Sequence, residues 1–184
     1  MDFLTIPNFF QNPDKIRELA LNQTFYRWED NPELRETDSN EIFYWGARTM
    51  PLSLVLEPVT YDLLLREYFQ KVFSVVKPPS KDKVGFEINC VFHSLTGDER
   101  IAPSDLHQDS SSYAGVVYLN DVTDINPDWH GTIILKDGEK VNVPYEYNKL
   151  VMYNGKYWHS ANAGFGNDLG TSRLTFNMFF NFIK

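Results

Sequence analysis

The sequence of residues 132–143 is TIILKDGEKVNV. Two runs of β-forming residues flank Asp137-Gly138, and an Asp-Gly pair in this position is a strong signal for a two-residue hairpin. Asn154-Gly155 lies in the same way between residues 150–153 and 157–159, and it predicts a second hairpin. The chain from residue 131 to residue 159 is therefore expected to form short antiparallel strands.

Similar β-like runs, separated by turn residues, continue on both sides of these two turns. Many short strands with well-marked turns are typical of a β-sandwich or barrel. The predicted strands cover residues 84–92, 114–120, 131–136, 140–143, 149–153, 157–162 and 172–182.

The first part of the chain has helical signals instead. Asn12 can cap a helix that has Pro13 in its first turn. A second helix is predicted from about Pro58 to Val76, because apolar residues recur there at spacings of three and four. Residues 26–50 have no clear periodicity, and we expect a long loop there.

Length and composition favour one globular unit. A chain of 184 residues that is 42% hydrophobic can build one well-packed core but is short for two. We therefore expect a single domain over residues 1–184, with residues 1–83 as a mainly helical support and residues 84–184 as a β-barrel core. The predicted fold class is mainly β with flanking helices.

The charge and the cysteine content restrict the partners and the compartment. A net charge of −8 argues against electrostatic binding to nucleic acid or to an anionic membrane. No stretch approaches the roughly 18 apolar residues of a membrane span. The lone Cys90 excludes an internal disulfide, fits a reducing compartment such as the cytoplasm, and is expected to be buried. The sequence gives no indication of the oligomeric state.

Three residues form a candidate metal site. His107 and Asp109 are two residues apart, so in extended backbone their side chains point to the same side. His159 lies in an aromatic strand far enough downstream to return across a barrel and supply a third ligand. Two imidazoles and one carboxylate leave the opposite face of the metal open, which is the facial arrangement of non-haem Fe(II) oxygenases. We expect Fe(II), with manganese or cobalt as substitutes in vitro.

Arg173 and Thr175 alternate on the last predicted strand and so face the same side. A dicarboxylate that chelates the metal through its 2-keto acid end needs a cation for its far carboxylate. Arginine fits this role because its planar fork donates two charge-assisted hydrogen bonds and stays protonated. Arg173 is therefore the predicted anchor for such a dicarboxylate.

In these residues the sequence is similar to the 2-oxoglutarate/Fe(II) oxygenases, particularly to their prolyl-4-hydroxylase-like branch. The similarity extends from about Phe86 to Phe182. Its motifs, in the family's order, are His107-x-Asp109, Val116-Val117-Tyr118-Leu119-Asn120-Asp121-Val122, Gly131-Thr132-Ile133, Trp158-His159-Ser160 and Arg173-x-Thr175.

The resemblance implies a double-stranded β-helix, a jelly-roll or cupin-like barrel, with the metal at its open end. It implies that Tyr118 helps Arg173 to hold the far carboxylate, with Thr175 beside it. The implied cofactor and co-substrates are Fe(II), 2-oxoglutarate and O₂, and the implied activity is a dioxygenase reaction that releases succinate and CO₂. No catalytic residue is expected beyond the metal centre. Asp109 favours hydroxylation, because related halogenases have a small residue at this position.

The sequence departs from the family pattern at two places, which could reshape the pocket. Trp129-His130 precedes Gly131 where the family usually has a second glycine, and the loop of residues 161–171 lengthens the spacing from His159 to Arg173.

The substrate is expected to be a small molecule or a peptide, and selectivity in such folds depends on loops. Residues 26–50 and 94–106 are expected to flank the mouth of the site, and His93 and His130 to be structural. Candidate substrate-binding side chains in these segments are Trp28, Tyr44, Trp45, Arg48 and Arg100.

Two other classes of function stay open. A cupin-like protein could bind a metal without oxygenase turnover, although such a protein has no need of Arg173. A metal-dependent hydrolase or isomerase could use the same three ligands to activate water. Dependence on 2-oxoglutarate distinguishes the oxygenase from the second class.

Overall fold

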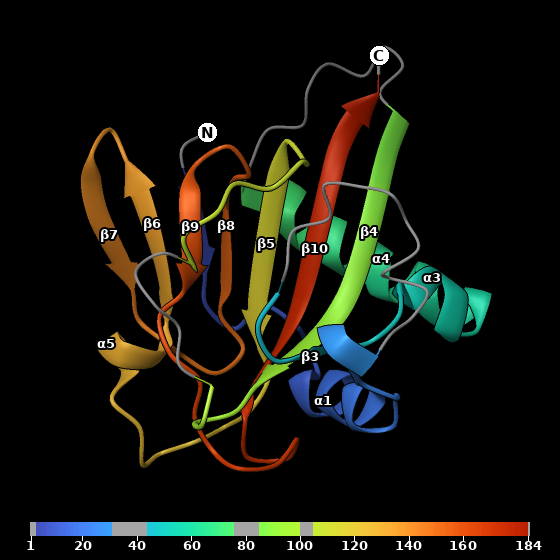
Figure 1. Cartoon of the computed structure of the whole chain (residues 1–184). Helices are drawn as coiled ribbons and strands as arrows, with labels where there is room; N and C mark the ends of the chain where they lie inside the picture. Colours follow the sequence, from blue (N-terminus) through green and yellow to red (C-terminus); the bar gives the residue numbers. More distant parts are fainter. Residues whose placement is uncertain (1–2, 31–43, 76–84, 100–104, 184) are drawn as a thin grey trace.

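The computed structural model describes residues 3–30, 44–75, 85–99 and 105–183. Two antiparallel sheets face each other, and helices cover the outer face of the larger one (Figure 1). The larger sheet has the order β1 (Phe3–Ile6), β8 (Leu150–Asn154), β5 (Tyr113–Tyr118), β10 (Arg173–Ile183), β4 (Gly85–Leu95), β3 (Ala47–Arg48) and β2 (Tyr26–Arg27). The smaller sheet has the order β7 (Glu139–Val143), β6 (Thr132–Lys136) and β9 (Trp158–Ala161).

From β4 onward the chain passes back and forth between the two sheets. After β4 an isolated antiparallel bridge joins His107 to His159, so the segment around His107 lies beside β9 at the edge of the smaller sheet. The chain then returns to β5, crosses to the β6–β7 hairpin, and alternates again through β8, β9 and β10. This winding is that of a double-stranded β-helix, and the predicted fold class is confirmed.

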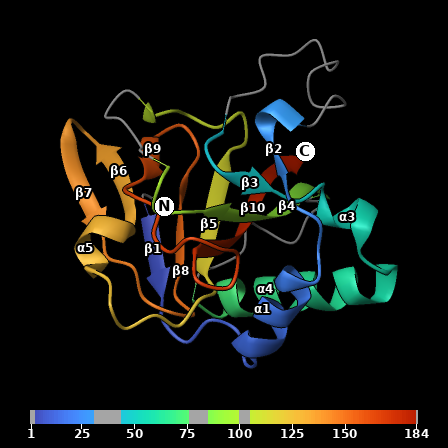
Figure 2. The same cartoon turned by 60° about the horizontal axis from the view of Figure 1, so that its bottom comes forward.

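Three helices lie on one side of the larger sheet, as Figure 2 shows. They are α1 (Pro13–Leu21), α3 (Leu52–Val55) and α4 (Pro58–Val75). The predicted cap is present, because the Asn12 side chain accepts a hydrogen bond from the Lys15 amide at 3.2 Å. On α4, Leu64, Tyr68 and Val72 are buried against the sheet, as their spacing predicts. A 3-10 helix, η1 (Trp28–Asp30), and a short helix, α5 (Pro127–His130), complete the described elements.

Strand β10 separates two cores. Its even-numbered residues from Leu174 to Phe180 are buried in the core beneath the helices, where the fully buried large side chains contribute roughly 1.5–3 kcal/mol each. The odd-numbered residues Arg173, Asn177 and Phe179 face the space between the two sheets. The alternation of a β-strand thus directs Arg173 and Asn177 to the inside of the barrel and apolar groups to the core behind it.

The two predicted turns have different outcomes. Asp137 (φ 52°) and Gly138 (φ 84°) form the two-residue turn of the β6–β7 hairpin, in which Lys136 pairs with Glu139. The hairpin predicted at Asn154-Gly155 is wrong, because β8 pairs with β1 and β5 while β9 pairs with β6. This turn carries the chain from one sheet to the other.

The prediction of a loop over residues 26–50 is also wrong in its described parts. That segment contributes β2, η1 and β3, and β3 pairs with β4 at the edge of the larger sheet. Strand β1, which was not predicted, extends the opposite edge beside β8. Residues 31–43 lie outside the described part of the chain. The helices that are described include none with the length and apolarity needed to cross a bilayer.

Candidate metal centre

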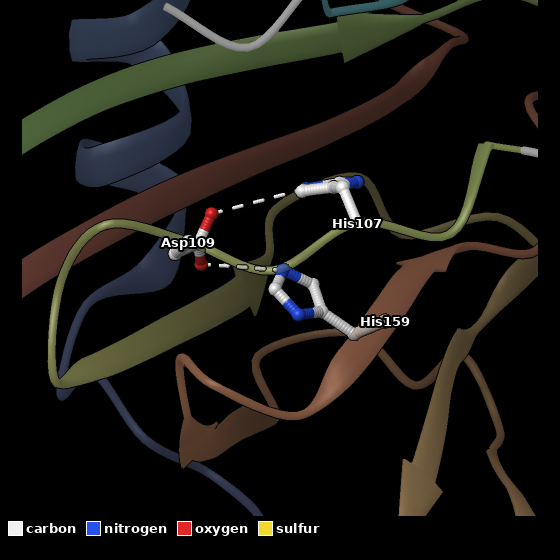
Figure 3. Close-up of side chains that lie close together, drawn as sticks. All are labelled: His107, Asp109 and His159. Atoms are coloured by element: carbon white, nitrogen blue, oxygen red, sulfur yellow. Dashed lines mark ion pairs between the residues drawn. The ribbon is translucent and has the colours of Figure 1, made fainter. Parts of the chain in front are cut away.

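The side chains of the three predicted metal ligands point toward one another (Figure 3). His107 and Asp109 lie on the segment between β4 and β5, and His159 lies on β9. Two backbone hydrogen bonds join the segments, from the His107 amide to the His159 carbonyl at 3.0 Å and from the His159 amide to the His107 carbonyl at 2.9 Å. The pairing of the two segments therefore brings the two imidazole rings to a centroid distance of 4.5 Å.

One ligand atom from each of the three residues lies within 4.8 Å of the others. His107 Nε2 is 3.8 Å from Asp109 Oδ1, and His159 Nε2 is 3.2 Å from Asp109 Oδ2. The Nδ1 atoms face backbone carbonyls, that of Asp105 at 3.0 Å and that of Tyr157 at 2.8 Å. A carbonyl can only accept, so each Nδ1 carries a proton and each Nε2 is the ring nitrogen that faces the centre.

Asp109 has the environment of a carboxylate that needs a cation. Its side chain is buried, and Oδ2 has no hydrogen-bond partner among the described residues. The Nε2 lone pair of a neutral His159 ring would repel Oδ2 at 3.2 Å, whereas a metal ion between them would attract both. Burial, followed by the neighbouring His159, lowers the pKa of His107, which favours the neutral ring that a metal requires. The three residues fit a divalent metal.

The turn after β8 holds the segment of residues 107–112, called the ligand segment below, in place. The Asp109 amide donates to the Gly155 carbonyl at 2.8 Å, and the Gly155 amide donates to the Ser112 carbonyl at 3.0 Å. A Cβ atom on residue 155 would lie 2.3 Å from the Ser111 carbonyl oxygen, so only glycine allows this approach. Lys156 Nζ also donates to the Asp109 carbonyl at 3.0 Å. The glycine that resembles a hairpin signal is thus required for packing against the ligand segment.

A cavity of about 460 Å³, including its open mouth, leads from the histidines into the barrel. Arg173 lines it and is only 3% exposed. Arg173 Nε donates to the His130 carbonyl at 2.9 Å, and Nη2 lies 3.1 Å from the Gly131 carbonyl and 3.3 Å from Thr132 Oγ1. The described residues offer Arg173 no carboxylate in an ion pair. A buried guanidinium without a counter-charge suits an anion in the cavity.

Tyr118 and Thr175 lie behind the wall of the cavity. The Tyr118 hydroxyl is 2.8 Å from Thr132 Oγ1, and Arg173 Cζ is 5.2 Å from the Tyr118 ring centre. Burial raises the pKa of Tyr118, so the phenol is neutral. Thr175 donates its hydroxyl to the His93 carbonyl at 3.3 Å. Thr132 lines the cavity beside Arg173, and only its place in the Gly-Thr-Ile motif signalled this from the sequence.

The other candidate residues have varied positions. His93 lines the cavity, with Nε2 2.6 Å from the Trp45 carbonyl, and Arg48 lines it as well. Trp28 packs edge-on against Tyr44. Arg100 lies outside the described residues. Cys90 is buried in the core, as predicted. Sequence reasoning did not identify Tyr153 or Asn177, which also line the cavity and carry no motif signal.

Comparison with solved structures shows the fold of the 2-oxoglutarate-dependent Fe(II) oxygenases. HygX from Streptomyces hygroscopicus, solved with nickel, 2-oxoglutarate and hygromycin B, matches with a TM-score of 0.61 at 14% identity, over 97% of this chain and 82% of HygX. A 2OG-Fe(II) oxygenase family oxidoreductase from Burkholderia pseudomallei matches with a TM-score of 0.64 at 11% identity, over 97% and 83%. A prolyl-4-hydroxylase from Pseudomonas putida matches with a TM-score of 0.50 at 17% identity, over 97% and 91%.

No family model matches the sequence, and no curated protein matches it either. At these identities the structural likeness establishes the fold alone. At that level it confirms the resemblance that the motifs predict. The His-Asp-His cluster has the composition that an Fe(II) site requires.

Proposed function

We propose that this chain is an Fe(II)- and 2-oxoglutarate-dependent dioxygenase that hydroxylates an amino acid, a peptide or another small molecule. One observation carries the proposal: two histidines of a three-ligand cluster and a buried arginine without a carboxylate partner line the same cavity. A metal site alone has no use for Arg173. A chelating dicarboxylate uses both features, because one end binds a metal and the other end needs a cation.

Each residue of the site has a defined task in this proposal. His107, Asp109 and His159 hold the metal on one face. Arg173 binds the far carboxylate of 2-oxoglutarate, and Thr132 with Tyr118 fixes the plane of its guanidinium. When bound, Fe(II) and 2-oxoglutarate supply oxygen activation, with succinate and CO₂ as the products of the co-substrate. The protein orients the substrate and excludes water, since the inner wall is buried.

The first test is an anaerobic titration of the Fe(II)-bound protein with 2-oxoglutarate. A chelated 2-keto acid gives ferrous iron a weak visible charge-transfer band, so we expect a saturable band in the wild-type protein. His107→Ala should lose the band, because one of the three ligands is absent. The surface variant Arg66→Gln, which alters only an exposed ion pair with Asp62 on α4, is the matched control and should keep it.

A protein that binds iron but shows no band with 2-oxoglutarate would contradict the proposal. That result would favour a metal-binding protein without oxygenase turnover, or a hydrolase or isomerase that uses the metal to activate water.

A further inference from the structure

A second arginine faces the cavity from the edge of the larger sheet. Arg48 on β3 pairs with His93 on β4, and His93 pairs with Thr175 on β10. Directly paired residues of antiparallel strands lie on the same face of a sheet, so Arg48 points toward the inside of the barrel. It lines the cavity together with His107 and Arg173.

The guanidinium of Arg48 has no partner that neutralises it. Arg48 Nε is buried and has no hydrogen-bond acceptor among the described residues. No carboxylate in that part of the chain forms an ion pair with it. The ring of Tyr44 stacks on the guanidinium, with Arg48 Cζ 4.3 Å from the ring centre.

Asn177 is the complementary unsatisfied group. It lies on β10, lines the same cavity, and is 7% exposed. Its Oδ1 atom is buried and receives no hydrogen bond from any described residue. Buried polar groups are almost always paired in folded proteins, so a donor on a bound molecule is the natural partner for this oxygen.

The balance of charges in the cavity also indicates that Arg48 needs an anionic group on a bound molecule. With the proposed metal and co-substrate bound, the divalent ion and Arg173 are balanced by Asp109 and the two carboxylates of 2-oxoglutarate. The ring of His93 is neutral, because burial holds its pKa well below the ordinary value. Among the described side chains that line the cavity, Arg48 then carries the charge that this balance leaves over.

We infer that the primary substrate is a free α-amino acid, whose carboxylate binds to Arg48 and whose ammonium group donates to Asn177. This inference rests on the proposed function and specifies its substrate. An internal residue of a peptide has neither a free α-carboxylate nor an ammonium group, so it would leave both side chains unsatisfied.

The test uses the full chain with Ni(II), an inert substitute for iron, and saturating 2-oxoglutarate. The twenty L-amino acids and their carboxamides are titrated separately by calorimetry. We expect at least one amino acid to bind, and its carboxamide to bind about tenfold more weakly or worse because the charged acceptor is gone. Arg48→Gln should weaken the binding of that amino acid by a similar factor. The affinity of this variant for 2-oxoglutarate should stay within about twofold of wild type. Arg66→Gln is the control and should change neither affinity.

Three results would overturn the inference. The first is that none of the twenty amino acids binds. The second is that a carboxamide binds as tightly as its acid. The third is that Arg48→Gln weakens the binding of 2-oxoglutarate as much as the binding of the amino acid. The last result would assign Arg48 to the co-substrate. Failure of the proposed function would be recognised separately, because the wild-type protein with metal would then not bind 2-oxoglutarate at all.

Discussion

Replacing Arg173 by lysine keeps the positive charge but removes the planar fork that anchors 2-oxoglutarate in our proposal. In the structure Nε and Nη2 are committed to the His130 and Gly131 carbonyls and to Thr132, so the remaining N–H groups are those available to a carboxylate. A lysine ammonium cannot satisfy the backbone carbonyls and present two hydrogen bonds to a carboxylate at once. The variant should lose about one charge-assisted hydrogen bond, which contributes about 1.5–3 kcal/mol. The affinity for 2-oxoglutarate should therefore fall roughly 10- to 150-fold.

The assay is the anaerobic charge-transfer titration, with Arg48→Lys as the parallel variant. Metal binding should be unchanged in Arg173→Lys, because Arg173 contacts none of the three ligand side chains through a hydrogen bond. The reasoning is refuted if Arg173→Lys binds 2-oxoglutarate within about twofold of wild type while Arg48→Lys does not, since the two arginines would then have exchanged roles.

Three further outcomes follow from the structure. Gly155→Ala should weaken Ni(II) binding and cost about 1–3 kcal/mol of stability, because its Cβ would meet the Ser111 carbonyl, whereas Gly138→Ala, with no atom within 4 Å, should leave Ni(II) affinity unchanged. Saturation with Ni(II) at a hundred times its Kd should raise the free energy of unfolding by about 2.7 kcal/mol, and His159→Ala should abolish this gain. Burial holds the pKa of His93 well below 6.5, so below that pH the unfolded chain binds a proton that the folded chain does not. The free energy of unfolding should therefore fall as the pH drops below 6.5. Urea titrations at several pH values should show a smaller fall in His93→Gln.

Each of these has an outcome that contradicts it. Equal Ni(II) affinity in both glycine variants would show that the turn does not hold the ligand segment. A thermal shift with Ni(II) that survives the loss of His159 would place the ion elsewhere. An unchanged pH dependence in His93→Gln would assign the acid sensitivity to another group.

The sequence predicts local turns well and long-range pairing poorly, as the two glycine turns show. Asp137-Gly138 forms a hairpin because both residues adopt positive φ and the flanking strands pair with each other. Asn154-Gly155 carries the same local signal, but Gly155 is not among the residues with positive φ. Its glycine is needed because the Ser111 backbone lies against it, a contact between segments some forty residues apart that no local pattern can reveal.

The convergence of His107, Asp109 and His159 could be predicted, because their residue types and their spacing favour a shared metal site. Their role as metal ligands stays a prediction. The position of Tyr118 beside Arg173 followed from the family resemblance, and the 5.2 Å stacking agrees with it. The prediction that Thr175 contacts the co-substrate stays a prediction. In the structure the Thr175 hydroxyl donates its hydrogen bond to the His93 carbonyl. Side-chain direction on a strand is predictable from alternation, whereas the choice of hydrogen-bond partner depends on the neighbouring strand.

The groups that we connect with the substrate were the hardest to place, and the reason is physical. Strand β3 has only two residues, too few to show a period, so Arg48 in the sequence resembles any solvated arginine of a loop. Its inward direction is set by pairing with His93, whose own direction is set by β10. The three candidate metal ligands need none of β2 or β3 for their geometry, because the His107–His159 bridge and the Gly155 turn already hold them. Changes in β3 should therefore alter which molecule binds while leaving metal and co-substrate affinity intact, and this separation is what allows one barrel to serve many substrates.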